Sequence, residues 1–260
     1  MRSILVSADR RPGMEARLET ALSLARSTGG HVTFLFDTPV ARYVAMDPMG
    51  GSYVASDALK QALADDDAAA ERLEQHMSRE DVAFDIVRSE AEPVEALSRA
   101  ARLADLVIVS RSGGLAGDLA LQSRTPILAV GDSAALSAPL GSACIAWDGG
   151  DEAACAMRHA VPLLAGCGAV RVITVAEKPG GFPPTDALRY LSRHGIKAEL
   201  DELSRRGSTE ETLDVAVSQS GADILIMGAY GKSRMREYLF GGVTRHFLDK
   251  QSGPALLLAH

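Results

Sequence analysis

The residues best suited to bind a ligand lie near the C-terminus, in a glycine-rich segment. Met227-Gly228-Ala229-Tyr230-Gly231 is followed, after nine residues, by Gly241-Gly242-Val243-Thr244. Glycines let backbone amides approach a ligand closely, and a helix N-terminus presents unpaired N–H groups to an anion. Residues 228–250 carry five basic and two acidic side chains in a chain of net charge −7. The segment therefore predicts a phosphate-type anion site, although an ordinary strand-to-helix connection would also contain glycines.

Two apolar strands must position this chemistry. One predicted strand, Ile224–Met227, ends at Gly228, and another, which begins at Cys144, ends in Asp148. Ligands of open parallel sheets bind at the carboxyl ends of strands, where the strand order reverses. If the two strands are neighbours, Asp148 and the glycine loop face one crevice. The carboxylate could then accept a hydrogen bond from an exocyclic amine or a ribose hydroxyl; the alternative is that Asp148 only turns the chain.

The chain contains two copies of one pattern. Each copy opens with a short apolar strand that ends in an aspartate, Asp9 or Asp148, and continues with alternating helices and strands. This alternation predicts right-handed crossovers and a parallel sheet. We predict two tandem α/β domains of five strands each, residues 1–131 and 141–260. The intervening segment, 131–141, is rich in small residues and chain breakers, as linkers usually are.

The glycine loop differs between the two copies. Gly231 precedes the final proline, Pro254, by 23 positions, whereas its counterpart Gly113 precedes Pro126 by 13. The first copy therefore lacks the second glycine pair, which predicts a degenerate loop in the N-terminal half and an intact motif in the C-terminal half. Asp9, without such a loop beside it, is expected to cap or turn the chain.

The segment from Gly228 to Gly231, with Gly241 after nine residues, resembles the signature of the universal stress protein family; Asp148 and Val243-Thr244 also match. The similarity covers the chain as a tandem two-domain member. It implies a doubly wound parallel sheet with strand order 3-2-1-4-5 in each half, an adenine-nucleotide alpha-hydrolase-like α/β fold. It also implies that the final strands of the halves meet across a two-fold axis, so that the chain packs as an internal pseudo-dimer; a further homodimer stays open.

In ATP-binding members of this family, adenine lies near the first-strand aspartate and the end of strand two, and the glycine loop holds ribose and phosphates. Carried over position by position, the adenine side would comprise Ala146, Trp147, Asp148 and Val175. The ribose and phosphate side would comprise Met227, Gly228, Tyr230, Gly231, Gly241, Gly242, Val243 and Thr244. The cofactor implied by the resemblance is ATP, with or without Mg²⁺.

Two positions depart from the ATP-binding pattern. Gly242 stands where that pattern has Ser or Thr, and Thr244 nearby is a candidate to replace the lost hydroxyl. A lost neutral hydrogen bond costs about 0.5–1.5 kcal/mol, so Gly242 should weaken ATP binding rather than abolish it. Trp147 is bulky for a residue beside an adenine pocket; it could stack on the base or fill the space.

Residues for catalysis are not evident. The six histidines show neither metal-ligand spacing nor a nucleophile partner. Gly231-Lys232-Ser233 is similar to the ending of a P-loop, but the predicted helix begins about ten residues later, whereas a P-loop leads directly into its helix. We therefore predict no catalytic residue, no metal site and at most slow ATP hydrolysis. The favoured function is a stress-response protein that binds ATP or a related adenine nucleotide. The alternatives are a nucleotide-free interaction or scaffold protein of the same fold, and a pocket for another small adenylate or an apolar ligand.

Composition restricts the partners. The chain has 260 residues, of which 47% are hydrophobic and 23% charged, as is ordinary for a soluble globular protein. Its acidic balance argues against nonspecific nucleic-acid binding, which requires neutralisation of phosphates. No stretch has the length of a membrane span, no signal peptide is evident, and the three cysteines lack metal-ligand spacing. We expect a cytoplasmic protein with reduced thiols and with neither nucleic acid nor membrane as partner.

Overall fold

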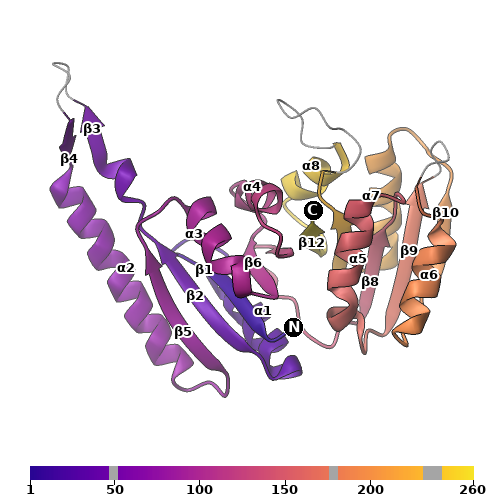
Figure 1. Cartoon of the computed structure of the whole chain (residues 1–260), viewed down its shortest axis with the longest axis horizontal. Coiled ribbons are helices and arrows are strands. Elements are labelled where there is room, and N and C mark those ends of the chain that lie inside the picture. The colour runs from indigo at the N-terminus through magenta and orange to yellow at the C-terminus, as the bar shows by residue number, and fades with distance from the viewer. Residues whose placement is uncertain (47–51, 176–180, 231–241) are drawn as a thin grey trace.

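The computed structural model describes residues 1–46, 52–175, 181–230 and 242–260 (Figure 1). In this part of the chain, ten strands form one sheet that runs through both halves, in the order β10-β9-β8-β11-β12-β7-β6-β1-β2-β5. The N-terminal half contributes β1 (Ser3–Ala8), β2 (His31–Asp37), β5 (Ala83–Ser89), β6 (Leu106–Ser110) and β7 (Ile127–Val130). The C-terminal half contributes β8 (Ser142–Ala146), β9 (Ala169–Val175), β10 (Glu199–Leu203), β11 (Ile224–Gly228) and β12 (Ala255–Ala259).

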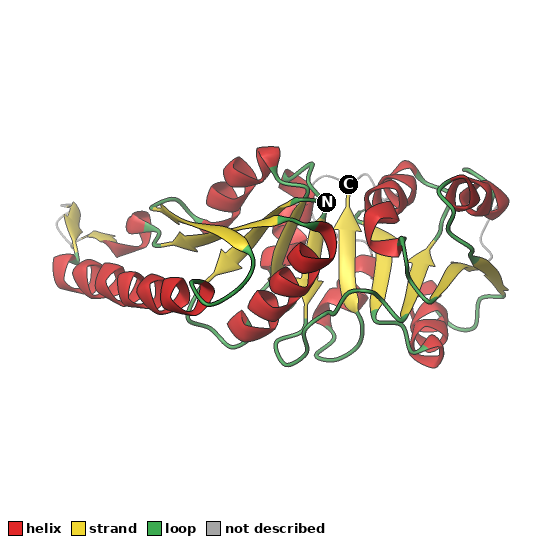
Figure 2. Cartoon of the chain, turned by 90° about the horizontal axis from the view of Figure 1, so that it is seen from below, coloured by secondary structure: helices red, strands yellow, loops and turns green. Residues whose placement is uncertain are grey.

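Each half has the expected strand order. The five strands of a half are parallel and, numbered within the half, follow the order 3-2-1-4-5. The halves join where β12 pairs antiparallel with β7, with Leu257 opposite Leu128. This pairing covers the outer edge of each final strand, and the view in Figure 2 shows the sheet continuing across it. The predicted pseudo-dimer of two α/β units is confirmed.

Helices cover both faces of the sheet. One face carries α1 (Met14–Thr28), α2 (Ser56–Met77), α5 (Asp151–Leu164) and α6 (Pro184–Arg193). The opposite face carries α3 (Pro93–Ala100), α4 (Leu115–Gln122), α7 (Thr209–Ser220) and α8 (Gly242–Asp249). Two short 3-10 helices, η1 (Val40–Tyr43) and η2 (Ala101–Leu103), and a separate hairpin of β3 (Val44–Met46) and β4 (Ser52–Val54) complete the elements. The hairpin and the first turns of α2 extend beyond the main sheet (Figure 1).

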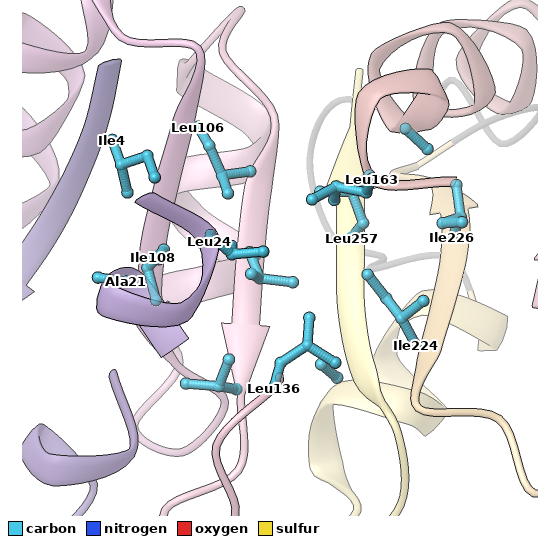
Figure 3. Packing of buried hydrophobic residues seen from close by; sticks show 14 of the residues in the cluster. Ile4, Ala21, Leu24, Leu106, Ile108, Leu136, Leu163, Ile224, Ile226 and Leu257 are labelled. Atoms are coloured by element: carbon cyan, nitrogen blue, oxygen red, sulfur yellow. The ribbon is translucent and has the colours of Figure 1, made fainter. Parts of the chain in front are cut away.

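Buried apolar side chains hold the halves together. Figure 3 shows Leu24, Ile108 and Leu136 facing Leu163 and Leu257 across the seam. Leu136 belongs to the connecting segment and is only 5% exposed. Its backbone N–H donates to Thr20 Oγ1 at 2.9 Å, so the connection is anchored on α1. Full burial of a leucine side chain stabilises a fold by about 1.5–3 kcal/mol, so this seam contributes substantially to the association of the halves.

An Ala-Asp pair, Ala104-Asp105 or Ala222-Asp223, precedes the fourth strand of each half and has the same structural role in both. Asp105 Oδ2 accepts the backbone N–H groups of Arg2 and Ser3 at 2.5 and 3.1 Å. In the second half, Asp223 Oδ2 accepts those of Gly141 and Ser142 at 2.7 and 3.0 Å. These bonds hold the pKa of Asp105 below its usual value. An aspartate before the fourth strand thus anchors the start of the first strand, which explains why both copies contain it.

Helix α7 begins at a capping box. The Ser208 side chain accepts the Glu211 N–H, and the Glu211 carboxylate accepts the Ser208 N–H, which together form a capping box.

Among the described residues, no helix combines the length and the apolar content that crossing a bilayer requires.

Candidate functional site

The first condition for a shared crevice in the C-terminal half is met. Strands β8 and β11 are parallel neighbours, with Ile226 opposite Ile145. Ala146 and Met227 follow these residues; Asp148 is the second residue after β8, and Gly228 ends β11. Both ends lie where the strand order reverses, because β9 and β11 flank β8 on opposite sides. This is the position at which open parallel sheets bind ligands.

Asp148 begins the turn that leads into α5. Its side chain is exposed, and its Oδ1 accepts the backbone N–H of Gly150 at 2.8 Å. Gly149 between them has φ +76°, a left-handed conformation that favours glycine. Asp148 therefore turns the chain, as the simpler hypothesis predicts, and its carboxylate is also accessible from solvent.

Packing by itself requires a glycine at position 228. A Cβ built on this residue would lie 2.6 Å from the backbone nitrogen of Ala153 and 2.7 Å from the carbonyl carbon of Glu152. The first turn of α5 therefore crosses the end of β11 at a distance that only glycine permits. A larger residue such as valine at position 228 would disturb this packing whether or not a ligand binds.

Trp147 is a core residue. Its side chain is 5% exposed and belongs to the same apolar cluster as Ile145 and Leu191. The indole Nε1 donates a hydrogen bond to the carbonyl oxygen of Phe182 at 3.0 Å. Of the two expectations for Trp147, the structure supports the filling of space, because the buried ring offers no free face on which a base could stack.

The remaining adenine-side residues lie at strand ends. Ala146 ends β8 and Val175 ends β9; both are half-buried and pack against the core on the α7 and α8 face of the sheet. They therefore lie beside Asp148 at the same edge of the sheet.

The structure describes part of the glycine motif. Met227 is 3% exposed and packs in the core. Tyr230 has φ +62°, an unusual value for a residue other than glycine. Burial, and then the charge of Asp118, raise the pKa of Tyr230 above its ordinary value. Gly231 and Gly241 lie outside the described residues.

The last part of the motif forms the start of α8. Gly242 is the first residue of this helix and is exposed. A Cβ at position 242 would lie 3.6 Å from Glu210 Oε1, which is an ordinary contact, so the position can accept a serine. Val243 is half-buried, and Thr244 is only 4% exposed. Because Thr244 is buried, we do not expect its hydroxyl to replace the one missing at position 242.

The equivalent crevice of the N-terminal half is occupied by an arginine from α1. Arg17 is 2% exposed. Its Nη2 donates to Asp9 Oδ1 at 2.5 Å, and its Nη1 donates to Ser110 Oγ at 2.6 Å. Asp9 Oδ1 also accepts the Arg11 N–H at 3.0 Å, so the expected turning role of Asp9 is present as well. One guanidinium thus connects the ends of β1 and β6.

Sequence reasoning did not identify Arg17, although a signal was available. The arginine lies four residues before Ala21, on the apolar face of its helix, where a charge is out of place. In the C-terminal half the corresponding positions of α5 are apolar. The correspondence follows from the packing: Gly13 contacts Ser110 at the end of β6, and Glu152 and Ala153 contact Gly228 at the end of β11. The residues four positions after Glu152 and Ala153 are Ala156 and Met157, both buried.

A cavity of about 740 Å³ lies between the halves. It is lined by the N-terminal loop residues Arg111–Gly114, by the start of α4 and by the C-terminal end of α8. Arg111 is 5% exposed and donates to three carbonyl oxygens of the other half, those of Ser252, Gly253 and Pro254, at 2.5–3.1 Å. The residue after β6 thus joins the two halves.

Within the described ranges, no cluster of three or more His, Cys, Asp or Glu residues could hold a metal ion.

Similarity to known proteins agrees with the fold and the motif. No protein-family model matches the chain. A stretch of 70 residues is 31% identical to a universal stress protein of Methanocaldococcus jannaschii; it covers 24% of this chain and 43% of that protein's length.

A crystal structure of a universal stress protein from Archaeoglobus fulgidus superposes with a TM-score of 0.75 at 14% identity, over 98% of this chain and 97% of the other. A functionally unknown protein from Pseudomonas aeruginosa gives a TM-score of 0.58 at 18% identity, over 100% and 92% of the two chains. At these identities the two structures show a shared fold, and the local sequence match spans less than half of the relative's length. With the strand order, these similarities agree with the resemblance of the glycine motif to that of universal stress proteins.

Proposed function

We propose that the chain binds ATP or a related adenine nucleotide in its C-terminal half and serves in a cytoplasmic response to stress. The observation that carries this proposal is the difference between the two crevices. In the N-terminal half, Arg17 bridges Asp9 and Ser110. In the C-terminal half, Asp148 and Gly228 lie at the ends of adjacent strands, and α5 presents apolar residues at the level of that arginine.

Different residues would contact different parts of the nucleotide. The exposed carboxylate of Asp148 can accept a hydrogen bond from the adenine amine or a ribose hydroxyl. Ala146 and Val175 offer apolar contact at the neighbouring strand ends. The N-terminus of α8, which begins at Gly242, presents amide groups suited to phosphate oxygens. Mg²⁺, when bound with the nucleotide, would neutralise part of the phosphate charge. We propose binding rather than efficient hydrolysis, because a P-loop leads directly into its helix, whereas α8 begins at Gly242, well after the Gly231-Lys232-Ser233 run of the sequence.

Asp148→Asn tests the adenine side of the site. Calorimetric titration of the wild type with ATP and Mg²⁺ should give about one site per chain. A hydrogen bond to a charged group contributes about 1.5–3 kcal/mol, so Asp148→Asn should lower the affinity roughly 10- to 100-fold. The amide keeps an oxygen that can accept the Gly150 N–H, so the turn should persist.

Asp9→Asn is the matched control, because Asp9 holds the same place in the N-terminal half. Its ATP affinity should equal that of the wild type once circular dichroism has shown that the variant is folded. Absence of ATP binding in the wild type would contradict the proposal. Loss of binding in Asp9→Asn with retention in Asp148→Asn would move the site to the other half.

A nucleotide-free interaction or scaffold protein is the second candidate. It is favoured by the start of α8, where Gly242 lacks a hydroxyl and the Glu210 carboxylate lies nearby, at 3.6 Å from a Cβ built on Gly242. That negative charge would oppose a phosphate. This function predicts no shift of the melting temperature with ATP and Mg²⁺. Mass spectrometry of small molecules released from the purified protein would distinguish ATP, another adenylate, an apolar ligand and an empty chain.

A further inference from the structure

An exposed aromatic ring lies next to the Asp148 turn. Phe182, in the segment before α6, is 55% exposed, although phenylalanine is among the residues most often buried. Two prolines, Pro183 and Pro184, follow it and lead directly into α6. Because proline fixes φ, the chain after Phe182 has little freedom.

The backbone of Phe182 is bonded to both residues that flank Asp148. Its N–H donates to the Gly149 carbonyl oxygen at 2.9 Å, and its carbonyl oxygen accepts the Trp147 indole N–H at 3.0 Å. The approach is close, because a Cβ on Gly149 would lie 2.7 Å from the Phe182 oxygen. Gly181 on the other side has φ +96°. Two glycines and two hydrogen bonds therefore hold Phe182 at a defined place beside Asp148 while its ring stays open to solvent.

The N-terminal half holds its corresponding turn by other means. Arg10, which follows Asp9, donates to Asp65 at 2.5 Å and lies 3.2 Å from Asp66, both on α2. An ion-pair cluster there takes the place of the backbone bonds to Phe182. The exposed ring beside the turn is thus a property of the half in which we place the nucleotide.

We propose that Phe182 is the stacking platform for the purine base of the bound nucleotide and that Trp147 is the residue that positions it. This inference rests on the function proposed above. Planar bases stack on aromatic side chains, and such a contact involves the base of a nucleotide and not its phosphates. Trp147 is the aromatic residue that the sequence suggests for this role, but its ring is buried and its N–H holds the Phe182 backbone instead.

Phe182→Ala, titrated with ATP and separately with inorganic triphosphate, tests the inference. Stacking of one base contributes about 1–3 kcal/mol, so ATP affinity should fall roughly 5- to 150-fold. Affinity for inorganic triphosphate, which has no base, should stay at the wild-type value. Phe182→Tyr should bind ATP as the wild type does, whereas Phe182→Leu, apolar but not aromatic, should resemble Phe182→Ala. Val215→Ala, at another exposed apolar residue that is 58% exposed, serves as the surface control.

A second measurement reports the contact directly. Phe182→Trp places an indole at the proposed platform, and its added fluorescence should be quenched by ATP and not by inorganic triphosphate. Equal ATP affinity in the wild type and Phe182→Ala would overturn the stacking role and leave the proposed function standing. A parallel loss of inorganic triphosphate binding would also overturn it, since the substitution would then act on the whole site. A wild type that binds no ATP would instead refute the proposed function.

Discussion

The two halves of the chain share one strand order but use the end of their first strand differently. Asp9 is bonded to a buried arginine that also reaches Ser110 at the end of β6. Asp148 and Gly228 lie at the ends of adjacent strands, and α5 carries alanine and methionine at the level of that arginine. Within the part of the chain that the structure describes, one half thus fills the end of its first strand with an arginine from its first helix, and the other half has apolar residues at the equivalent helix positions. The difference depends on a single helix position rather than on the architecture.

The residue after the fourth strand shows a second difference. In the N-terminal half it is Arg111, whose guanidinium binds the carbonyl oxygens of Ser252–Pro254. In the C-terminal half the same place holds Ala229, which is fully buried. The N-terminal loop therefore serves the contact between the halves, and the C-terminal loop retains the glycine motif. Duplication allows one copy to support the fold while the other keeps the residues suited to a ligand.

Arg17→Met should give the largest change, because it removes the side chain that fills the first crevice. Breaking a buried ion pair costs about 3–5 kcal/mol; since Asp9 is 27% exposed, we expect the low end of that range. Guanidinium chloride unfolding measures this free energy. Arg10→Met is the matched control, and since Arg10 is 46% exposed the expected loss is at most about 1 kcal/mol. A loss below about 1 kcal/mol for Arg17→Met would show that the guanidinium does not stabilise this crevice.

Arg111→Met should have the next largest effect. Burial lowers the pKa of Arg111, yet its guanidinium stays bonded to carbonyl oxygens of the other half. Charged hydrogen bonds contribute about 1.5–3 kcal/mol, and methionine keeps part of the apolar contact, so a loss of about 2 kcal/mol is expected. The same unfolding assay applies, with Arg99→Met, at a 69% exposed position, as control. Equal stability of the two variants would mean that Arg111 does not join the halves.

Asp37→Asn should produce a smaller, pH-dependent gain. Burial, and then the charge of Asp9, raise the pKa of Asp37 from its ordinary value of 3.8 to about 6. Because this pKa is higher in the folded state, ionisation above pH 6 costs stability, and the cost disappears as the pH falls towards 4. At pH 8 Asp37→Asn should therefore be more stable than the wild type by about 1–2 kcal/mol, after allowance for solvent screening.

Chemical unfolding at pH 8 and pH 4.5 checks the prediction for Asp37. The gain should be clear at pH 8 and about a third as large at pH 4.5, where the carboxyl group is protonated in the folded chain but already mostly ionised in the unfolded one. Glu202→Gln, at an exposed position, should show no such change. The corresponding end of β9 is Val175, so this electrostatic cost belongs to the N-terminal crevice. A gain of the same size at both pH values would mean that ionisation of the Asp37 carboxyl group is not its cause.

Gly242→Ser should have the smallest effect and concerns the other crevice. A restored hydroxyl donor should raise ATP affinity up to about tenfold, since one neutral hydrogen bond contributes about 0.5–1.5 kcal/mol. Gly242→Ala adds the Cβ without the hydroxyl and should leave the affinity near that of the wild type. Calorimetric titration of both variants separates the hydroxyl from the added bulk. Identical affinities for serine and alanine would indicate that position 242 does not contact the phosphates.

Much of the fold could be predicted from particular residues. Apolar strands that end in Asp9 and Asp148, helices that end at glycines, and prolines before both final strands indicated two α/β units. The aligned Ala-Asp pairs were a sound guide to the repeat, because each aspartate caps the start of its first strand. Such features are local, or repeat at a fixed spacing, and are therefore visible in one sequence.

The site was less predictable. The adjacency of β8 and β11 was inferred correctly; for Trp147 the sequence left two outcomes open, of which the structure shows the buried one, and the burial of Thr244 was not foreseen. Arg17, Arg111 and Phe182 were not selected by sequence reasoning at all. Each of them acts on residues that are distant in the chain, such as Ser110 for Arg17 and Ser252 for Arg111.

The sequence by itself determined the periodicity, the duplication and the unequal glycine loops, because hydrophobic spacing and chain-breaking residues act over a few positions. Only the tertiary structure decided which crevice is filled and which aromatic ring is exposed. Those outcomes depend on the path of α1 across the end of β6 and on the close approach of Gly149 to Phe182. Both are set by packing among elements far apart in the chain, where a few ångströms separate a core residue from one that can meet a ligand.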